Sequence, residues 1–315
     1  MDYKKVSSIK DGVLLTGVKN FYPSHIFECG QCFRWNRVSE DDDSRFIGVV
    51  KGKVLEVYTS GDDAVIMNIS EEEFNETFRD YFDLERDYDS IKNKLSIDPI
   101  LLKAVEFGYG IRILNQDPFE TLLSFIISAN NGIPRIKEAV RKISLNYGNE
   151  LTYKGEKYYS FPSPRELRDV TEDDFRALGV GFRAKYLYDT SQRVNDALDA
   201  LEAREARPLK ENEKQFLKYD LDYIKSLDHK LTHKSLQEFK GVGPKVSDCV
   251  MLFSMKKKEA FPVDVWVKKA MNHFYGVNVN SLPKIRDFGQ EKFKENAGFA
   301  QQYLFYYARE NNIKI

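Results

Sequence analysis

A short glycine-rich segment and two charged residues form the pattern in this chain that could most clearly do chemistry. The segment is Gly241-Val242-Gly243-Pro244-Lys245, and Asp264 follows it in Phe261-Pro262-Val263-Asp264. The glycines can adopt positive φ angles and approach a ligand closely, so amides at this turn could bind a nucleic-acid phosphate oxygen. Lys245 and Asp264 would then supply a nucleophilic amine and an anion for reaction at one electrophilic carbon.

Lys245 is expected to lie at the start of a helix. Leu236 and Phe239 end one predicted helix, and Pro244 begins the next, whose apolar side carries Val246, Cys249, Val250 and Phe253. The positive end of a helix and desolvation both disfavour an ammonium group, which suits an amine that must be neutral to attack carbon. A plain helical hairpin with a surface lysine that binds phosphate is the simpler alternative.

Asp264 precedes a predicted helix that ends at Gly276. An aspartate at this position caps the helix and contributes about 1 kcal/mol, which alone would explain its presence. The combination of Asp264 with Lys245 and the hairpin glycines favours a catalytic role instead.

The composition limits the class of protein. The chain has 315 residues, 42% of them hydrophobic, which is enough for one large or two ordinary domains and argues against disorder. Its net charge of −1 argues against nucleic-acid binding through bulk charge, but not through local contacts. No apolar run reaches the roughly 20 residues of a membrane span, and no signal peptide is recognisable. The 3 cysteines cannot form a disulfide framework, so we expect a reducing, intracellular compartment.

The chain divides into a β-rich part over residues 1–96 and a helical part over residues 97–315. A hairpin is predicted from Arg45–Val50 and Val54–Tyr58 around Lys51-Gly52-Lys53, and another strand from Ala64–Ile69. Capping and periodicity then predict a central helix that begins at Asp117-Pro118-Phe119-Glu120 and ends at Asn130-Asn131-Gly132, and a helix from Ile136 to Gly148. Ser163-Pro164-Arg165-Glu166 repeats the capping pattern, and the charge-rich residues 201–218 suggest a solvated helix face or a connection.

The hairpin, its lysine and the Pro-Val-Asp segment resemble the helix-hairpin-helix superfamily of DNA glycosylases, specifically its 8-oxoguanine branch. The resemblance implies an α+β fold: a TATA-binding-protein-like N-terminal domain (1–96) and a large helical glycosylase domain (97–315). It implies that Gly241, Val242 and Gly243 hold a DNA phosphate, that Lys245 attacks C1′ of a flipped nucleoside, and that Asp264 stabilises the developing positive charge. A Schiff base and β-elimination of the strand would follow.

Other segments extend the resemblance to a base pocket. Cys29-Gly30-Gln31-Cys32-Phe33-Arg34-Trp35 is similar to a family segment whose glycine carbonyl accepts a hydrogen bond from N7–H, the proton that distinguishes 8-oxoguanine from guanine. Gly30 matches that glycine. Gln301 and Phe305, which share a helix face, match residues that read the base edge and stack on its ring. Cys249 matches a residue on the opposite wall of the base pocket. Without the resemblance, Phe305 would be interpreted as a core residue.

Two further segments match the family's contacts with the opposite strand. In Ser128–Arg135, Asn130 matches the residue that fills the space of the extruded base, and Arg135 matches a reader of the orphaned cytosine. In Leu178–Tyr186, Phe182 matches an apolar wedge and Arg183 a second cytosine reader. A helix C-cap for Asn130, a solvated Arg135 and a core Phe182 are the simpler alternatives.

Two features depart from the pattern or compete with it. Trp266 stands where eukaryotic members have a histidine, which puts a phosphate contact there in question. Cys29 and Cys32 have metal-binding or redox spacing, with His25 nearby, but we interpret both as packing residues because no second such pair exists. We therefore expect no metal and no cofactor for catalysis.

Together these patterns predict a monomeric enzyme that excises 8-oxoguanine, preferably opposite cytosine, from double-stranded DNA and then cuts the strand. We expect no membrane association, and a location in the cytoplasm or nucleoid of a bacterium or in the nucleus of a eukaryote. One alternative is a glycosylase of the same fold that acts on alkylated bases without strand cleavage, which Lys245 disfavours. Another is a DNA-binding module without catalysis, which Lys245, Asp264 and the pocket residues disfavour.

Overall fold

The N-terminal part of the chain forms a six-stranded antiparallel sheet. The structure, a computed structural model, describes residues 1–208, 210–277 and 281–313. The strand order is β1-β2-β6-β5-β4-β3. The bounds are β1 Lys5–Ile9, β2 Gly12–Thr16, β3 Trp35–Arg37, β4 Arg45–Val50, β5 Lys53–Ser60 and β6 Asp63–Met67. The predicted hairpin is confirmed as β4 and β5, because Val50 pairs with Lys53 and the turn residues Lys51 and Gly52 have φ angles of 48° and 75°.

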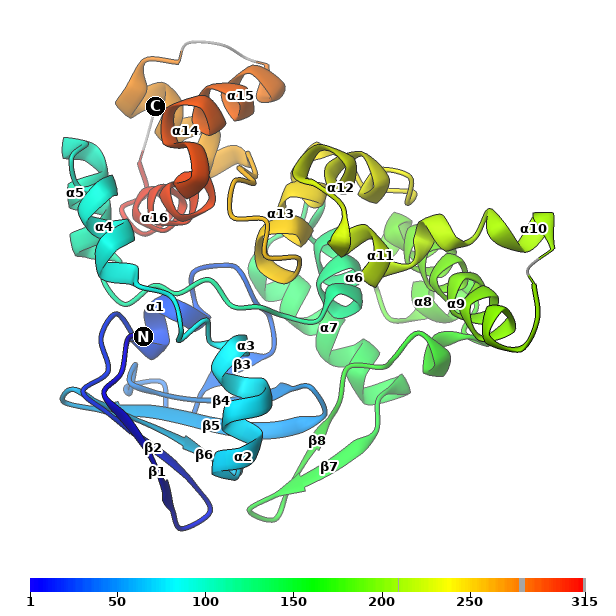
Figure 1. Ribbon diagram of the computed structural model, residues 1–315, viewed down its shortest axis with the longest axis horizontal. Helices are drawn as coiled ribbons and strands as arrows, with labels where there is room; N and C mark the ends of the chain where they lie inside the picture. The colour runs from blue at the N-terminus through cyan, green and yellow to red at the C-terminus, as the bar shows by residue number, and fades with distance from the viewer. Residues whose placement is uncertain (209, 278–280, 314–315) are drawn as a thin grey trace. The chain divides into compact units, whose positions relative to one another are not determined.

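Short helices cover an apolar core on the sheet. They are α1 (Pro23–Phe27), α2 (Glu71–Glu73), a π-helical turn (Phe74–Phe78) and α3 (Arg79–Tyr81) (Figure 1). In this core the Phe27 ring stacks on Trp35 with 4.0 Å between the ring centroids. The β-rich N-terminal part and the large helical remainder confirm the predicted α+β class.

The C-terminal helices return to the N-terminal part of the chain. Figure 1 shows α14 (Val265–Tyr275), α15 (Leu282–Phe293) and α16 (Ala297–Glu310) beside α4 (Tyr88–Leu95) and α5 (Pro99–Phe107). One compact unit therefore comprises Met1–Gln116 and Leu252–Ile315, and the other comprises Asp117–Met251. These units do not divide at residues 96 and 97, where the sequence pattern changes, because helices from both ends of the chain pack on one another.

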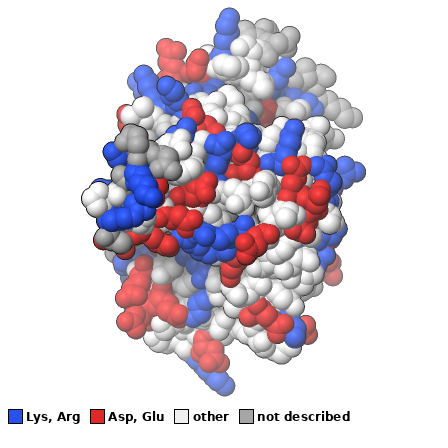
Figure 2. All heavy atoms as spheres, turned by 90° about the vertical axis from the view of Figure 1, so that its right-hand side faces the viewer, with Lys and Arg blue, Asp and Glu red and all other residues white. Residues whose placement is uncertain are grey.

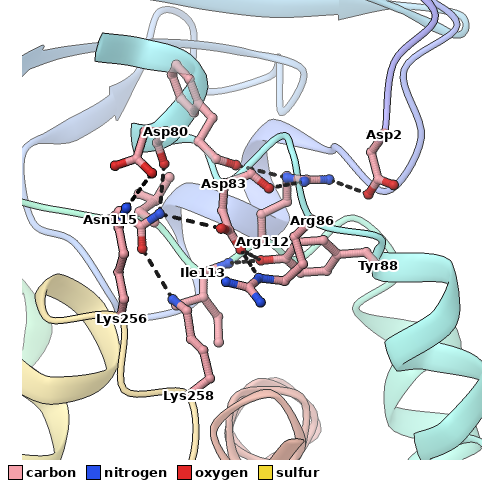
Figure 3. Close-up of polar contacts among 12 residues, drawn as sticks. Asp2, Asp80, Asp83, Arg86, Tyr88, Arg112, Ile113, Asn115, Lys256 and Lys258 are labelled. Carbon is pink, nitrogen blue, oxygen red and sulfur yellow. Dashed lines mark hydrogen bonds and ion pairs between the residues drawn. The ribbon is translucent and has the colours of Figure 1, made fainter. Parts of the chain in front are cut away.

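A buried polar network ties distant segments of the first unit together (Figure 3). The fully buried Arg112 donates to the Asp2 carboxylate at 2.7 Å and to the Phe82 carbonyl at 3.0 Å, and its guanidinium lies 4.2 Å from the Tyr88 ring. These hydrogen bonds replace those that the guanidinium would make with water, so the charge can be buried. Through Arg112 the network joins Asp2 to Phe82, in the segment after α3.

The second unit is helical apart from one small hairpin. Its elements are α6 (Pro118–Ser128), α7 (Ile133–Tyr147), β7 (Glu150–Tyr153), β8 (Glu156–Tyr159), α8 (Glu172–Ala177), α9 (Ala184–Ala206), α10 (Glu211–Lys214), α11 (Leu221–Ser226) and α12 (His229–Leu236). The helix α13 (Pro244–Ser254) begins in this unit. The two helices predicted on either side of Asn130 are confirmed as α6 and α7, whereas the β7–β8 hairpin was not predicted.

Two weaker predictions in this unit had mixed outcomes. The reciprocal bonds of the Ser163 and Glu166 capping pattern form, but they begin a 3-10 turn over Arg165–Leu167 rather than an α-helix. Residues 201–218 comprise the end of α9, α10 and a 3-10 turn (Leu217–Tyr219), with residue 209 outside the described residues.

Charged side chains of both signs are interspersed on the face shown in Figure 2. Ion pairs between such side chains include Arg176 with Glu172 on α8, and Arg165 of the 3-10 turn with Asp199 on α9. Such mixing agrees with the near-zero net charge and favours local rather than bulk electrostatic contacts with a nucleic acid.

Candidate DNA-binding and catalytic site

The helical hairpin between α12 and α13 has the geometry that its glycines predict. Gly241 has a φ of +84°, and a Cβ atom there would lie 2.6 Å from the Tyr186 ring. Gly243, in contrast, has open space around the position of a Cβ. Pro244 is the first residue of α13, and amides in a first helical turn have no intrahelical carbonyl to bind. The turn can therefore bring backbone N–H groups close to an anion.

Lys245 lies half-buried in the first turn of α13, and its amine is held at the end of α6. The Lys245 Nζ donates to the Ser128 hydroxyl at 3.1 Å, and that hydroxyl donates to the Phe125 carbonyl at 2.7 Å. The same Nζ is 5.1 Å from the centroid of the Phe125 ring. Ser128 thus orients the predicted nucleophile. No sequence pattern assigned a role to Ser128, although this residue precedes Asn130 in the segment that resembles the family.

The turn after α6 presents Asn130 to solvent. Ala129 is the C-cap of α6, and Asn130 follows with a φ of +51°, a conformation that asparagine tolerates better than most residues. Arg135 is exposed on the first turn of α7. Phe182 is also exposed, at 53% of its surface, with its ring edge against Tyr186. A core position for Phe182 is therefore wrong, and an exposed ring agrees with a wedge.

Arg183, predicted to contact the orphaned cytosine, is buried in the structure instead of facing solvent. It is 9% exposed, and its Nε donates to the Ala129 carbonyl at 3.0 Å. Its Nη2 donates to the carbonyls of Ala129 and Asn130, the second at 3.0 Å. Desolvation lowers the pKa of Arg183. The guanidinium therefore binds the backbone of the turn that carries Asn130.

Cys249 is the last of the predicted site residues that lie in the second unit. It is buried one turn after Lys245 on α13, and its thiol forms no disulfide. Asp264, in contrast, belongs to the first unit.

Asp264 has the predicted position at the N-cap of α14. Its Oδ1 accepts a hydrogen bond from the Val267 amide at 2.8 Å, and the side chain is only half-buried. The capping role that the sequence predicts for Asp264 is therefore confirmed, through its Oδ1. Near it on α14, the Lys269 Nζ lies 4.6 Å from the ring of Trp266.

The first unit brings Gly30 and Phe305 into contact. Gly30 has a φ of +79°, and a Cβ atom there would lie 2.9 Å from a Phe305 ring atom. The segment is held from α16, because the Gln302 amide donates to the Cys29 carbonyl at 2.6 Å and Arg309 donates to the Glu28 carbonyl. Only glycine fits this combination of conformation and close approach.

Gln301 lies on the same helix as Phe305. It is 4% exposed, and its Oε1 has no hydrogen-bond partner among the described residues. A buried acceptor without a partner is costly in a free protein, so it marks a place where a ligand donor would be favourable. Phe305 is half-buried rather than enclosed in the core.

The Cys29 and Cys32 pair is buried and not disulfide-bonded. Burial raises the pKa of the Cys29 thiol to about 11, and His25 accepts a hydrogen bond from the Gly110 amide at 3.1 Å through its Nδ1. Over the described residues, no three His, Cys, Asp or Glu side chains are grouped to hold a metal ion. No helix within the described part of the chain is long and apolar enough to cross a membrane.

Comparisons with known proteins cover nearly all of the chain. Residues 13–122 match the N-terminal domain family of 8-oxoguanine DNA glycosylase, and residues 123–295 match the HhH-GPD superfamily of base excision DNA repair proteins. A probable N-glycosylase/DNA lyase of Methanothermobacter thermautotrophicus is 30% identical over 268 residues, which cover 78% of each chain. The N-glycosylase/DNA lyase of Saccharomyces cerevisiae is 30% identical over 294 residues, covering 89% of this chain and 75% of the yeast protein.

A solved structure is still more similar. It is the Clostridium acetobutylicum 8-oxoguanine glycosylase/lyase in complex with double-stranded DNA that contains cytosine opposite 8-oxoguanine. It has 53% sequence identity and a TM-score of 0.90, and the alignment covers 99% of this chain and 100% of that one. The chain therefore belongs to the helix-hairpin-helix superfamily of base excision DNA repair proteins and, within it, to the 8-oxoguanine DNA glycosylases of the N-glycosylase/DNA lyase type.

Proposed function

We propose that this N-glycosylase/DNA lyase binds double-stranded DNA, flips 8-oxoguanine out of a pair with cytosine, removes it, and then cuts the strand with Lys245. The observation that carries the proposal is the position of Lys245. The residue follows the hairpin directly, and its amine is oriented by the Ser128 hydroxyl at 3.1 Å.

The proposed reaction uses the Lys245 amine as its nucleophile. The Lys245 Nζ attacks C1′, the C1′–N9 bond breaks, and its electron pair leaves with the base, which takes up a proton. The sugar ring opens to give an imine between C1′ and Nζ. Loss of a C2′ proton then expels the 3′ phosphate by β-elimination. The Asp264 carboxylate stabilises the positive charge that develops at C1′, and no cofactor is needed.

Recognition of the base is assigned to the contact between Gly30 and Phe305. The Gly30 carbonyl accepts the N7–H of 8-oxoguanine, a proton that guanine lacks, and the Phe305 ring stacks on the base. The unpartnered Oε1 of Gln301 supports a role as acceptor for donors on the Watson–Crick edge. Cys249 is assigned to the opposite wall of the pocket.

We assign the contacts with the opposite DNA strand to exposed side chains of the second unit. Asn130 fills the space of the extruded base, Phe182 wedges between base steps, and Arg135 donates to the acceptor edge of the orphaned cytosine. Gly241, Val242 and Gly243 hold a backbone phosphate. We expect the protein to act as a monomer in an intracellular compartment.

The alternative of a glycosylase for alkylated bases has weaker support. The Archaeoglobus fulgidus 3-methyladenine DNA glycosylase structure shares the fold at 20% identity and a TM-score of 0.66. An enzyme that only hydrolyses the glycosidic bond needs an aspartate but no amine, so the oriented Lys245 favours the glycosylase/lyase. The oriented amine equally disfavours a non-catalytic DNA-binding module.

Borohydride trapping tests the proposal. On duplex DNA with 8-oxoguanine opposite cytosine, the wild type should nick the strand and form a covalent adduct that borohydride makes permanent. Lys245→Gln should form no adduct. Asp264→Asn keeps the amine and most of the cap, so it should still form the adduct but at a single-turnover rate lower by orders of magnitude. Undiminished trapping by Lys245→Gln would exclude Lys245 as the nucleophile.

A further inference from the structure

Arg309 lies beside the two residues that the proposed base pocket uses for recognition. It follows Phe305 by four residues on α16, so the two side chains share one face of the helix. Its guanidinium carbon lies 5.3 Å from the centroid of the Phe305 ring. Its Nη1 is 3.4 Å from the position that a Cβ atom of Gly30 would take. Arg309 is therefore adjacent to both members of the pair formed by Gly30 and Phe305.

Hydrogen bonds from α16 hold the segment that leads into Gly30. The Arg309 Nη2 donates to the Glu28 carbonyl, and the Gln302 amide donates to the Cys29 carbonyl at 2.6 Å. Two successive peptide groups before Gly30 are thus fixed by side chains of one helix. The direction of the next carbonyl, that of Gly30, depends on these two bonds.

The remaining N–H groups of Arg309 argue for a role in the pocket. Its Nε donates to the carboxylate of the exposed Glu310 at 2.7 Å, a kind of pair that adds little stability. Its Nη1 is buried and has no hydrogen-bond partner in the part of the chain that the structure describes. A buried donor without a partner costs free energy in the folded protein. Stability alone therefore explains this arginine poorly, whereas its place beside Gly30 and Phe305 explains it well.

We propose that Arg309 is a positioning residue for the recognition of 8-oxoguanine. The proposal rests on the proposed function, because Arg309 acts through the two residues assigned there to the base. By binding the Glu28 carbonyl, Arg309 sets the direction of the Gly30 carbonyl toward N7–H. By its cation–π contact, it holds the Phe305 ring in the orientation on which the base stacks.

This role predicts a selective defect when Arg309 is lost. Guanine carries no N7–H, and an abasic analogue carries no base, so neither makes the full set of contacts that Arg309 supports. Binding to 8-oxoguanine DNA should therefore weaken, while binding to guanine DNA and to abasic DNA changes little. A residue that only stabilises the fold would change all three affinities about equally.

Equilibrium binding in the Lys245→Gln background measures this selectivity without cleavage. The probes are duplexes that contain 8-oxoguanine, guanine or a tetrahydrofuran abasic analogue, each opposite cytosine. Arg309→Met keeps a long side chain but removes the charge and the N–H groups. It should lower the 8-oxoguanine-to-guanine affinity ratio about fivefold to tenfold, the effect of losing one hydrogen bond and one cation–π contact. Arg309→Lys keeps the cation but lacks the planar fork, so it should recover only part of the ratio.

Arg86→Met is the matched control. The Arg86 guanidinium carbon lies 5.6 Å from the ring of Phe299, which is also on α16, and its Nε donates to the Asp83 carboxylate at 2.6 Å. This variant removes an arginine–phenylalanine contact from the same helix but none that involves Gly30 or Phe305. It should leave the affinity ratio unchanged.

A double-variant cycle tests whether Arg309 acts through Phe305. Arg309→Met combined with Phe305→Ala should lower the affinity ratio by less than the product of the two single effects, as expected when one residue acts partly through the other. Fully multiplicative effects would overturn the positioning role. An unchanged ratio in Arg309→Met, or an equal loss of affinity for the abasic duplex, would overturn it as well.

The unmodified Lys245→Gln protein should bind 8-oxoguanine DNA more tightly than guanine DNA. Equal affinities would overturn the assignment of Gly30 and Phe305 to the base, and with it the positioning role of Arg309. Absence of 8-oxoguanine excision by the wild type would instead refute the proposed function itself.

Discussion

At the scale of single residues, the proposed nucleophile Lys245 binds a hydroxyl that the sequence pattern did not reveal. Ser128 both accepts from Lys245 and donates to the Phe125 carbonyl, so its rotation is fixed. A fixed acceptor restricts the directions in which the amine can point. This restriction reduces the conformational search before attack at C1′.

Ser128→Ala should therefore slow imine formation by about threefold to tenfold, the loss expected for one hydrogen bond of about 1 kcal/mol. The rate of borohydride trapping under single-turnover conditions measures this effect. Ser128→Thr keeps the hydroxyl and should restore most of the rate. Ser247→Ala is a suitable control, because it removes a buried hydroxyl that donates to the His233 carbonyl at 3.0 Å rather than one that binds Lys245. Equal rates for Ser128→Ala and the wild type would show that Ser128 does not orient the amine.

At the scale of elements, the two glycines of the hairpin serve different purposes. Gly241 has a left-handed backbone pressed against the Tyr186 ring, so its lack of a side chain is needed for folding. Gly243 has no positive φ and no neighbour within 4 Å of a Cβ. The open space at Gly243 is where a phosphate would approach the backbone amides.

The two glycines can be separated by alanine substitution. Gly241→Ala should lower the melting temperature by several degrees, because a left-handed alanine costs about 1–2 kcal/mol and its Cβ would overlap Tyr186. Gly243→Ala should leave the melting temperature nearly unchanged and weaken binding to duplex DNA, because the new methyl group occupies the space of the phosphate. Thermal melting and DNA titration at fixed salt distinguish these outcomes. A large loss of stability in Gly243→Ala with unchanged DNA affinity would contradict the assignment.

At the scale of the whole molecule, buried charge links segments far apart in the sequence. Lys258 is 6% exposed, and its Nζ lies 3.3 Å from the Asn115 amide oxygen and 3.4 Å from the Leu252 carbonyl (Figure 3). Burial lowers the pKa of Lys258 from 10.5 to about 8, against an opposing effect of the Asp83 carboxylate. The folded chain therefore loses this proton at a lower pH than the unfolded chain.

The stability contribution of Lys258 should rise with pH. Below about pH 8 both states hold the proton, and the cost of burying the charge is fully present. Between about pH 8 and 10.5 the unfolded chain holds more protons, so the folded state gains up to about 3 kcal/mol. Urea unfolding should show the wild type gaining stability relative to Lys258→Met over this range. Lys256→Met, which removes an exposed lysine paired with Asp80 at 2.6 Å, is the control, and the wild type should gain no stability relative to it over this range. Parallel curves for the wild type and Lys258→Met would refute the prediction.

Local patterns in the sequence determined much of this protein. The turn at Lys51 and Gly52, the caps at Asp117 and Asp264, and the proline that begins α13 depend on neighbouring residues, so their chemistry could be read directly from the chain. The motifs also identified the family.

Tertiary packing alone decided which side chains are buried and which distant segments contact one another. Arg183 could not be distinguished from a solvent-facing arginine by sequence, because its acceptors are carbonyls on another helix. The Ser128 bond to Lys245 and the contact between Gly30 and Phe305 likewise join residues far apart in the chain. The predicted boundary at residues 96 and 97 differs from the compact units for the same reason. The local sequence pattern indicates which conformation each segment prefers. Burial and pairing between distant segments, in contrast, are fixed only when the chain folds.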